Sequence, residues 1–320
     1  MPNVQIEKII KRADKINSSN ANWRNYFSEL ATFSLPRKAW INSRKTKGQA
    51  LKFNSIYDST AIRGLKIMAA GFHSNLTNPA SKWFNLRTRY LPYMEDKEVQ
   101  MWFKEVEDKI FATLNSSNFD TTMQEFYLNA GCFGTSTILI LEDTRDKVRF
   151  TEIPIEQIAL EEDAYGIVNR VYRTFPLTVQ QAYDLWGDNA GKTVLEKIEA
   201  TPNEVVSFMH YVAPREQRDA SKVDGVNMPY ESIWIAVKDA SEVAKGGYED
   251  FPYAVGRFYK DVSDVFGYSP TMDVLADIKL INTQTKTILR KAMKDADPAL
   301  ILPRRGFILP LNSNPNAKLP

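Results

Sequence analysis

Apolar residues in the first part of the chain recur at the three- and four-residue spacing of amphipathic helices. This spacing predicts helices within residues 3–33 and over residues 58–75, 95–114 and 119–130. Between the second and third of these segments, the aromatic residues of 83–86 are typical of a short strand. The N-terminal part of the chain is therefore expected to be mainly helical.

From Thr135 onward the pattern changes to short apolar runs and to alternation of apolar and polar residues, as in half-buried strands. In this region helical patterns recur at Pro176–Trp186 and Thr193–Ile198. The predicted strands cover residues 137–141, 148–153, 167–175, 205–213 and 232–237. This mixture predicts an α+β region that follows the helical one.

The last long element follows Gly267-Tyr268-Ser269-Pro270 and covers residues 271–296, which contain no glycine or proline. A helix of this length would extend for about 39 Å. Asp297-Pro298 ends it, because the residue before a proline avoids the helical conformation. Two short apolar runs around Arg304-Arg305-Gly306 then resemble a hairpin.

These patterns divide the chain into four regions. A helical region covers residues 1–134, an α+β region covers residues 135–266, a long helix covers residues 267–297, and a terminal segment covers residues 298–320. The predicted fold class is α+β.

Composition excludes several classes of protein. The chain has 320 residues, 43% of them hydrophobic, which is enough for a packed core, and its formal net charge of +2 does not indicate a nucleic-acid partner. A single cysteine, Cys132, rules out an internal disulfide and fits a reducing compartment. No apolar run has the length of a membrane helix, and no signal peptide precedes the first helix. We therefore expect a protein made and used in the cytosol, or in an assembly built there.

Charge is unevenly distributed along the chain. Residues 1–52 hold eleven Lys/Arg and three Asp/Glu, whereas residues 142–163 hold eight Asp/Glu and three Lys/Arg. Two solvated faces would account for this pattern. Alternatively, the basic residues Arg44, Lys45 and Lys47 contact DNA or the acidic segment of a neighbouring subunit.

The chain carries few of the residue patterns on which enzymes depend. His73 and His210 lack further metal ligands at a suitable spacing, and Cys132 is expected to be a buried, inert thiol. Gly187–Thr193 resembles the phosphate-binding loop G-x-x-x-x-G-K-[ST], but it is one residue short and follows a helical pattern instead of a strand. A connection between two helices is the simpler explanation. We expect no catalytic residues, no metal and no cofactor, and a nucleotide-dependent enzyme is kept as an alternative.

One face of the helix predicted over residues 271–296 is basic. Its residues follow three- and four-residue steps and therefore lie on one side: Lys279, Thr283, Lys286, Arg290 and Lys294. This pattern suits an ordinary amphipathic helix with a solvated basic side. It would also allow the helix to face a phosphate backbone without reading bases.

Short motifs spread over residues 23–303 occur in a recognisable order. They are Trp23, Tyr26 and Leu35-Pro36-Arg37; Ile56–Thr60, Ala69–Gly71, Asn75–Pro79 and Trp83-Phe84; Phe133–Thr135; Pro154, Gly166, Arg173, Thr178, Gln181 and Trp186-Gly187; and Pro252, Arg257-Phe258, Gly267–Pro270, Asp273 and Ile278-Lys279. Each motif alone is weak. Their order and spacing resemble the head-to-tail connector, or portal, family of short-tailed double-stranded DNA phages.

The resemblance implies a portal fold, in which subunits form a ring, usually of twelve, around a channel for double-stranded DNA. Residues 1–134 and 135–266 would form the wing, residues 267–297 the first stem helix, and residues 298–320 the start of the clip. Chains of this family are normally longer, and a second stem helix follows the clip. The resemblance therefore implies that this chain stops within the clip.

The resemblance also implies a structural role without catalysis, at one vertex of the virion, after assembly in the host cytoplasm. DNA would be packaged and ejected through the ring, and ATP hydrolysis would belong to a separate terminase. The implied partners are other copies of the chain, double-stranded DNA without sequence specificity, the major capsid protein, scaffolding or internal core proteins, the terminase and tail adaptor proteins, with no membrane. Another virion protein, such as an adaptor or an internal head protein, is a second alternative.

The same hypothesis assigns roles to basic residues near the C-terminus. Lys286, Arg290 and Lys294 are expected to face the DNA channel, and Arg304 and Arg305 are expected to face the tail. The face of the helix that turns toward the channel does not follow from the sequence pattern.

Overall fold

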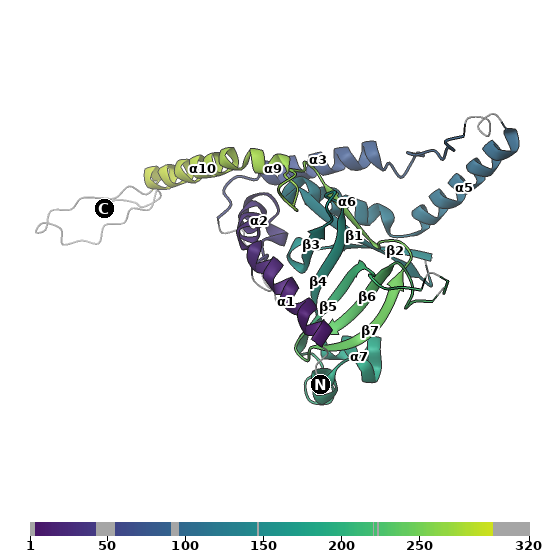
Figure 1. Ribbon diagram of the computed structural model, residues 1–320. Coiled ribbons are helices and arrows are strands. Elements are labelled where there is room, and N and C mark those ends of the chain that lie inside the picture. The colour runs from purple at the N-terminus through teal and green to yellow at the C-terminus, as the bar shows by residue number, and fades with distance from the viewer. Residues whose placement is uncertain are drawn as a thin grey trace, which may run out of the picture.

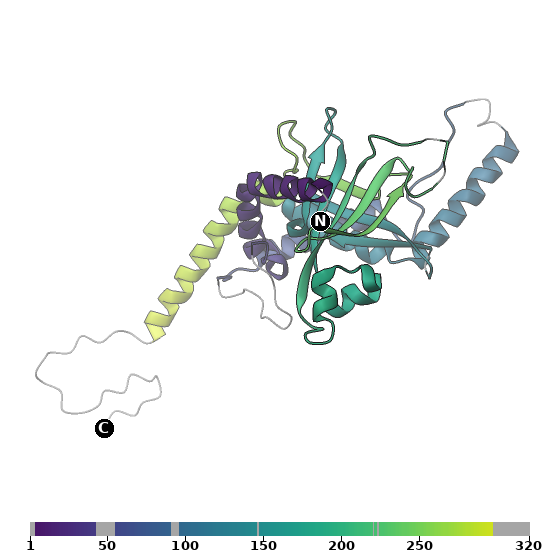
Figure 2. The ribbon, with the colours of Figure 1, turned by 60° about the horizontal axis from the view of Figure 1, so that its bottom comes forward.

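The computed structural model describes residues 4–42, 55–90, 96–145, 147–219, 221–222 and 224–296. It shows a mixed α and β protein, in which two antiparallel sheets and the helices packed on them form a body (Figure 1). Two helices, α10 (Leu275–Ala296) and α5 (Lys97–Ser116), project from this body in different directions (Figures 1 and 2). Within the described ranges, no helix combines the length and the hydropathy of a membrane span.

The described strands form two sheets in which all neighbouring strands are antiparallel. The smaller sheet has the order β2-β1-β8 and the larger sheet the order β3-β4-β5-β6-β7. The bounds are β1 (Thr135–Asp143), β2 (Lys147–Ile153), β3 (Ile158–Glu162), β4 (Val168–Thr178), β5 (Val205–Pro214), β6 (Tyr230–Ala236), β7 (Ser241–Tyr248) and β8 (Tyr253–Arg257). The whole larger sheet lies between β1 and β8 in sequence, so the smaller sheet is complete only when the chain returns to it.

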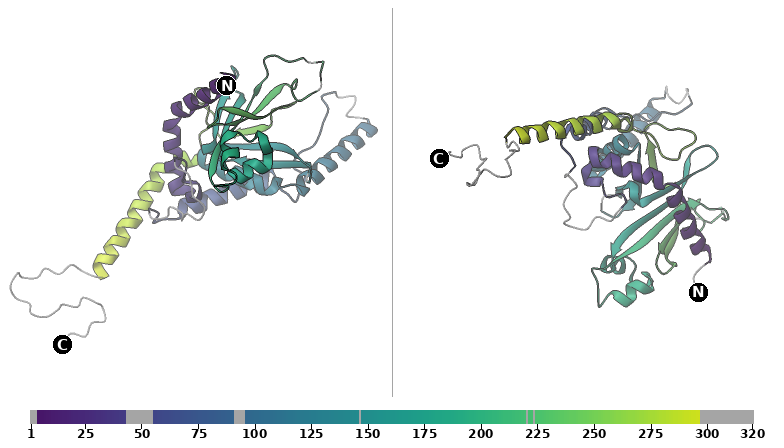
Figure 3. Two further views of the ribbon diagram at one scale, coloured as in Figure 1. Left: turned by 90° about the horizontal axis from the view of Figure 1, so that it is seen from below. Right: turned by 90° about the vertical axis from the view of Figure 1, so that its left-hand side faces the viewer.

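Helices cover the sheets from several sides (Figure 3). They are α1 (Val4–Ser19), α2 (Ala21–Ser34), α3 (Thr60–Leu76), α6 (Phe119–Phe133), α7 (Val179–Trp186), α8 (Lys192–Lys197) and α9 (Pro270–Asp273), with 3-10 turns at Pro36–Lys38, Ile155–Gln157 and Gly187–Asn189. The apolar spacing read from the sequence therefore corresponds to real helices in the N-terminal part of the chain.

Three clusters of buried apolar side chains hold the body together. The largest joins α2, α3 and α6 to both sheets, with Phe27, Phe133 and Leu139 among its members. In the second, α1 lies on the larger sheet and buries Ile6 and Ile9 against it. In the third, α7 and α8 cover the part of the larger sheet around Phe208. Because each large apolar side chain contributes about 1.5–3 kcal/mol when fully buried, these clusters dominate the stability of the body.

Two glycines allow the backbone to cross itself at the base of the long C-terminal helix. Gly134 ends α6 in the left-handed conformation, with φ of 70°. A Cβ atom at this position would overlap the backbone of Gly267, which passes directly beside it. A hydrogen bond joins the two segments at this point, because the Gly267 N–H donates to Thr135 Oγ1 at 2.7 Å. Glycine is required at Gly134 for both reasons.

The long C-terminal helix is fastened to the end of α6 by two hydroxyl groups. Ser269 Oγ donates to the carbonyl of Cys132 at 2.8 Å, and Thr271 Oγ1 donates to the carbonyl of Gly131 at 2.7 Å. The prediction of one continuous helix over residues 271–296 is wrong in one detail. The helix is interrupted at Val274, which separates the fastened turn α9 from α10.

Several other predictions need correction. The strand predicted over residues 167–175 continues through Pro176, because Thr178 forms a capping box with Gln181 and α7 begins only at Val179. The strand predicted at residues 83–86 is absent, since no described strand pairs with this extended stretch. Its Leu86 N–H instead donates to the buried Glu107 carboxylate of α5 at 2.6 Å. The edge strands β3, β7 and β8 were not predicted.

Asn118, which precedes α6, covers the free edge of β2. Its Oδ1 accepts a hydrogen bond from the Phe150 N–H at 2.9 Å, and its Nδ2 donates to the Phe150 carbonyl at 2.6 Å. The side-chain amide thus makes the two hydrogen bonds that a neighbouring strand would make with Phe150.

Candidate functional site

The basic face predicted for the C-terminal helix lies on α10, and its residues have different surroundings. Lys279 is paired with Glu29 of α2. Lys286 is half-buried, with Nζ 5.2 Å from the centre of the Tyr57 ring. Arg290 and Lys294 are exposed, and in the part of the chain that the structure describes neither takes part in an ion pair. The cations nearest the body are therefore engaged, and those nearest the free end are available.

The body holds α10 by the side between its basic and apolar faces. Leu275 and Asn282 are seven residues apart, lie on the same side of the helix, and are its buried residues. Ile281 and Ile288, also seven residues apart, form a separate exposed apolar stripe. At about 100° per residue, this stripe lies nearly opposite the basic face. α10 therefore presents two accessible faces of opposite chemistry.

Asn282 was not singled out from the sequence, although its side chain makes three hydrogen bonds with a distant segment of the chain. Its Oδ1 accepts from the N–H groups of Tyr57 and Asp58, and its Nδ2 donates to the carbonyl of Ser55. An asparagine within a polar helix face gives no sequence signal that distinguishes it from a solvated residue. Only the position of residues 55–58 beside α10 reveals it.

Three carboxylates of the acidic segment 142–163 pair with cations from other parts of the chain. Glu152 pairs with Lys38 at 3.2 Å, and Glu162 pairs with Arg257 and Lys260. Glu161 pairs with Arg12 of α1 at 2.7 Å. The predicted patch of Arg44, Lys45 and Lys47 and the predicted tail-facing Arg304 and Arg305 lie outside the described residues.

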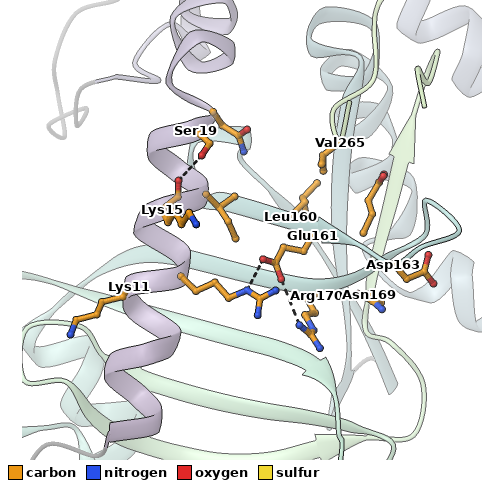
Figure 4. A pocket seen from close by; sticks show the side chains of 13 residues that line it. Lys11, Lys15, Ser19, Leu160, Glu161, Asp163, Asn169, Arg170 and Val265 are labelled. Carbon is orange, nitrogen blue, oxygen red and sulfur yellow. Dashed lines mark hydrogen bonds and ion pairs between the residues drawn. The ribbon is translucent and has the colours of Figure 1, made fainter. Parts of the chain in front are cut away.

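A cleft of about 950 Å³ lies between α1 and the β3–β4 part of the larger sheet. Figure 4 shows Glu161 and Arg170 in this cleft, with Lys11 and Lys15 on the helix that borders it. Glu161 accepts from Arg12 and lies 3.9 Å from Arg170, so it bridges two cations. These charges attach α1 to the sheet, and none of the described residues that line the cleft pairs a nucleophile with a general base.

The loop Gly187–Thr193 holds a carboxylate where a nucleotide phosphate would lie. It follows α7, not a buried strand, and its first residues, Gly187–Asn189, form a 3-10 turn. At the start of α8, the Thr193 N–H donates to Asp239 Oδ2 at 2.9 Å, and the Thr193 hydroxyl donates to Asp239 Oδ1. Since Asp239 would repel a phosphate, the geometry does not support the nucleotide-binding alternative.

Three further side chains of types that can take part in catalysis, His210, Cys132 and His73, lie in surroundings that favour a structural role. His210 is buried between Tyr253 and Ser232, and burial lowers the pKa of its imidazole to about 3. Burial raises the pKa of the Cys132 thiol to about 12, which makes it unreactive. His73 lies 2.9 Å from Asp120. Over the described ranges, no three His, Cys, Asp or Glu side chains are grouped so that they could hold a metal ion.

Comparisons with known proteins agree with the expectation from the motifs. The family model described as bacteriophage head to tail connecting protein matches residues 6–318. The chain is 26% identical over 302 residues to a probable portal protein of Bordetella phage BPP-1, which covers 92% of this chain and 54% of that protein. It is also 26% identical over 308 residues to the portal protein of Salmonella phage epsilon15, with 95% and 55% covered. The chain thus spans about half the length of these curated relatives.

Proposed function

The chain belongs to the family of bacteriophage head to tail connecting proteins, and from this membership we propose that it is a subunit of a portal ring. The ring would occupy one vertex of the capsid, and double-stranded DNA would enter and leave through it. The structural observation that carries the proposal is α10, a long helix that leaves the body with exposed basic residues near its free end.

We assign the regions of the chain as follows. Residues 1–134 and 135–266 form the wing, residues 267–297 contain the first stem helix, and residues 298–320 begin the clip. The body suits a wing, because its three apolar clusters are formed almost entirely by residues outside α10. The clip, with Arg304 and Arg305 toward the tail, lies outside the described residues.

Lys286, Arg290 and Lys294 are proposed to face the DNA. In a ring of the twelve subunits usual in the family, each would occur at many equivalent positions around the channel. Equivalent positions attract phosphates without favouring one register, so the DNA could slide at nearly constant energy. The proposed attraction is electrostatic, and it weakens as salt concentration rises.

The first test of the proposal is electron microscopy of the purified chain, alone and expressed with any coding sequence that follows residue 320. Rings with a channel about as wide as a DNA duplex are expected, and class averages would give the subunit number. Another virion protein, such as an adaptor, would form no such ring. The absence of rings from both samples would overturn the proposal.

The second test reverses the charge of the basic face with Lys286→Glu, Arg290→Glu and Lys294→Glu together. We expect DNA packaging and DNA retention to fall while assembled rings persist. Unchanged packaging and retention would remove these residues from the DNA-facing role.

A matched control makes the same change in net charge on α1, at three exposed lysines: Lys8, Lys11 and Lys15. This variant should package DNA normally. Equal loss in both variants would mean that total charge matters, and not the position of the charge on α10.

The patch of Arg44, Lys45 and Lys47 is proposed to contact DNA or a neighbouring subunit. Because Glu152, Glu161 and Glu162 of the acidic segment already pair with cations within the chain, DNA is the better supported of the two. Lys45→Glu with Lys47→Glu should then weaken DNA contact and leave the yield of rings unchanged. A loss of rings would favour the neighbouring subunit.

The proposed partners follow from the ring. They are other copies of this chain, the major capsid protein, scaffolding or internal core proteins, a terminase that hydrolyses ATP, and tail adaptor proteins. In this proposal the chain itself has no catalytic task, and its location is the portal vertex of the virion.

A further inference from the structure

Residues Ser55–Asp58, which precede α3, form a seat for α10. Asn282 Oδ1 accepts from the Tyr57 N–H at 2.7 Å and from the Asp58 N–H at 3.2 Å, while its Nδ2 donates to the Ser55 carbonyl at 2.9 Å. The Asn282 residue is 8% exposed. Only a side-chain amide of this length both accepts and donates here, so a carboxylate or an aliphatic side chain cannot replace it fully.

The contacts of α10 with other elements end close to the seat. Lys279, Asn282 and Lys286 lie three and four residues apart and meet Glu29, the seat backbone and the Tyr57 ring in turn. Beyond them, every residue of 287–296 is exposed. The outer half of α10 therefore has no described support, and its direction is set by the contacts at its base.

Small changes at the seat are amplified along the helix. The last residue of α10 lies fourteen residues beyond Asn282, a length of about 20 Å. A tilt of about 15° at the seat would move that end by about 5 Å over this length. A charge-assisted hydrogen bond needs its atoms within about 3 Å, so such a movement is enough to make or break a phosphate contact.

We propose that Asn282 is the positioning residue of α10, and that its hydrogen bonds to Ser55–Asp58 aim the exposed Arg290 and Lys294. The role assigned to these two cations rests on the proposed function, whereas the aiming of the helix does not. The proposal also gives a role to the motif Ile56–Thr60. The N–H groups of its Tyr57 and Asp58 donate to Asn282, and its Tyr57 ring lies under Lys286.

The experiment measures the direction of α10 by double electron–electron resonance between two spin labels. Lys291→Cys places one label on the exposed half of α10, and Tyr165→Cys places the other on the body, where Tyr165 is 89% exposed. Cys132 is the single native cysteine and is fully buried, so the labels attach only to the introduced residues.

Asn282→Ala is expected to broaden the distance distribution at least twofold, or to shift it by about 5 Å for a helix of this length. Asn282→Asp has the same size and leaves no cavity, but it cannot donate to Ser55 and places a charge beside Asp58. It should give a smaller change in the same direction. Gln284→Ala, at an exposed position two residues away, should leave the distribution unchanged.

A second label pair, Tyr165→Cys with Leu185→Cys, reports on the body alone, because both native side chains are exposed there. Its distances should stay the same in all Asn282 variants, which shows that the body remains folded. An unchanged α10 distribution in both Asn282→Ala and Asn282→Asp, with this pair also unchanged, would overturn the proposal.

Binding of duplex DNA by the same full chains, measured by fluorescence anisotropy, separates this inference from the proposed function. If both hold, Asn282→Ala alters the DNA affinity several-fold at low salt, and Gln284→Ala does not. If α10 moves but neither Asn282→Ala nor the Arg290→Glu and Lys294→Glu pair changes the affinity, the seat stands and the DNA role fails.

Discussion

The larger sheet and α10 differ in how far their apolar side chains are exposed. In the larger sheet, Val171, Phe208 and Ile235 are completely buried. On α10, Ile288 and Met293 are more than 60% exposed, and Arg290 beside them has no ion-pair partner among the described residues. A region whose side chains are already satisfied maintains the fold, whereas one with both apolar and basic residues exposed is equipped to meet partners. The difference separates scaffold from working surface within one chain.

The strongest disruption of the scaffold is expected at the backbone crossing. Gly134→Ala should cost about 3 kcal/mol or more, because a Cβ atom would overlap Gly267 and φ is positive. Gly71→Ala is the control. Its Cβ would meet nothing within 4 Å, so the better helix propensity of alanine should stabilise α3 by about 0.5–1 kcal/mol. Chemical denaturation of both variants checks the pair, and equal effects would refute the account of the crossing.

A pair of isoleucines compares the two regions directly. Ile233→Ala in β6 should lower the free energy of unfolding by about 2–4 kcal/mol, since Ile233 is 2% exposed. Ile288→Ala on α10 should change it by less than about 0.5 kcal/mol, since Ile288 is 67% exposed. Urea unfolding of the chain measures both values. A large cost at Ile288 would show that α10 is packed in solution.

The scaffold also contains a carboxylate that opposes folding at neutral pH. Burial raises the pKa of Glu156, and the nearby Lys38 only partly offsets this effect. A raised folded-state pKa means that stability is fully present below the ordinary pKa of glutamate and is lost as pH rises through the folded value. Glu156→Gln should therefore stabilise the chain at pH 7 by about 1 kcal/mol or less, with no gain near pH 3. Thermal unfolding at the two pH values tests this, and a gain of equal size at both would exclude the titration.

Among these substitutions, those of Arg290 and Lys294 should have the smallest effect on stability and the largest effect on DNA binding. Arg290→Ala with Lys294→Ala should change the free energy of unfolding by less than about 0.5 kcal/mol, because both residues are exposed. The same variant should lower duplex affinity and reduce the dependence of log K on log salt by up to about 2. Affinity measured over a salt series tests the second statement. An unchanged slope would mean that these cations do not contact phosphates.

The sequence predicted the elements whose residues follow a local period. The helices α1 and α6 and the strands β5 and β6 are confirmed, because one face of each is buried along most of its length. The helix α5 is also confirmed, although only Glu107 and Phe111 of its residues are buried. β7 and β8 were missed for a physical reason. β7 is a polar edge strand with two glycines, and β8 is short and gains its partner, β1, only through a pairing distant in sequence.

The candidate site was predicted only in part. The three- and four-residue spacing placed Lys286, Arg290 and Lys294 on one side of a helix, and the structure contains that helix. The spacing could not reveal that Lys279 is neutralised by Glu29 or that Asn282 receives residues 55–58, since both contacts join segments far apart in sequence. Contacts of this kind depend on tertiary structure and leave no local pattern.

The side-chain amide of Asn118 also affects whether strands of different copies could pair at the edge of β2. The unpaired backbone groups of an uncovered edge strand can pair with a strand of another molecule and so extend the sheet. Copies of one chain held close together would be continuously exposed to such pairing. Asn118 occupies both backbone groups of Phe150, so a strand from another copy finds no free hydrogen-bonding groups at this point of the β2 edge. In the proposed ring, this contact would suppress strand pairing between neighbouring copies at this point of the β2 edge.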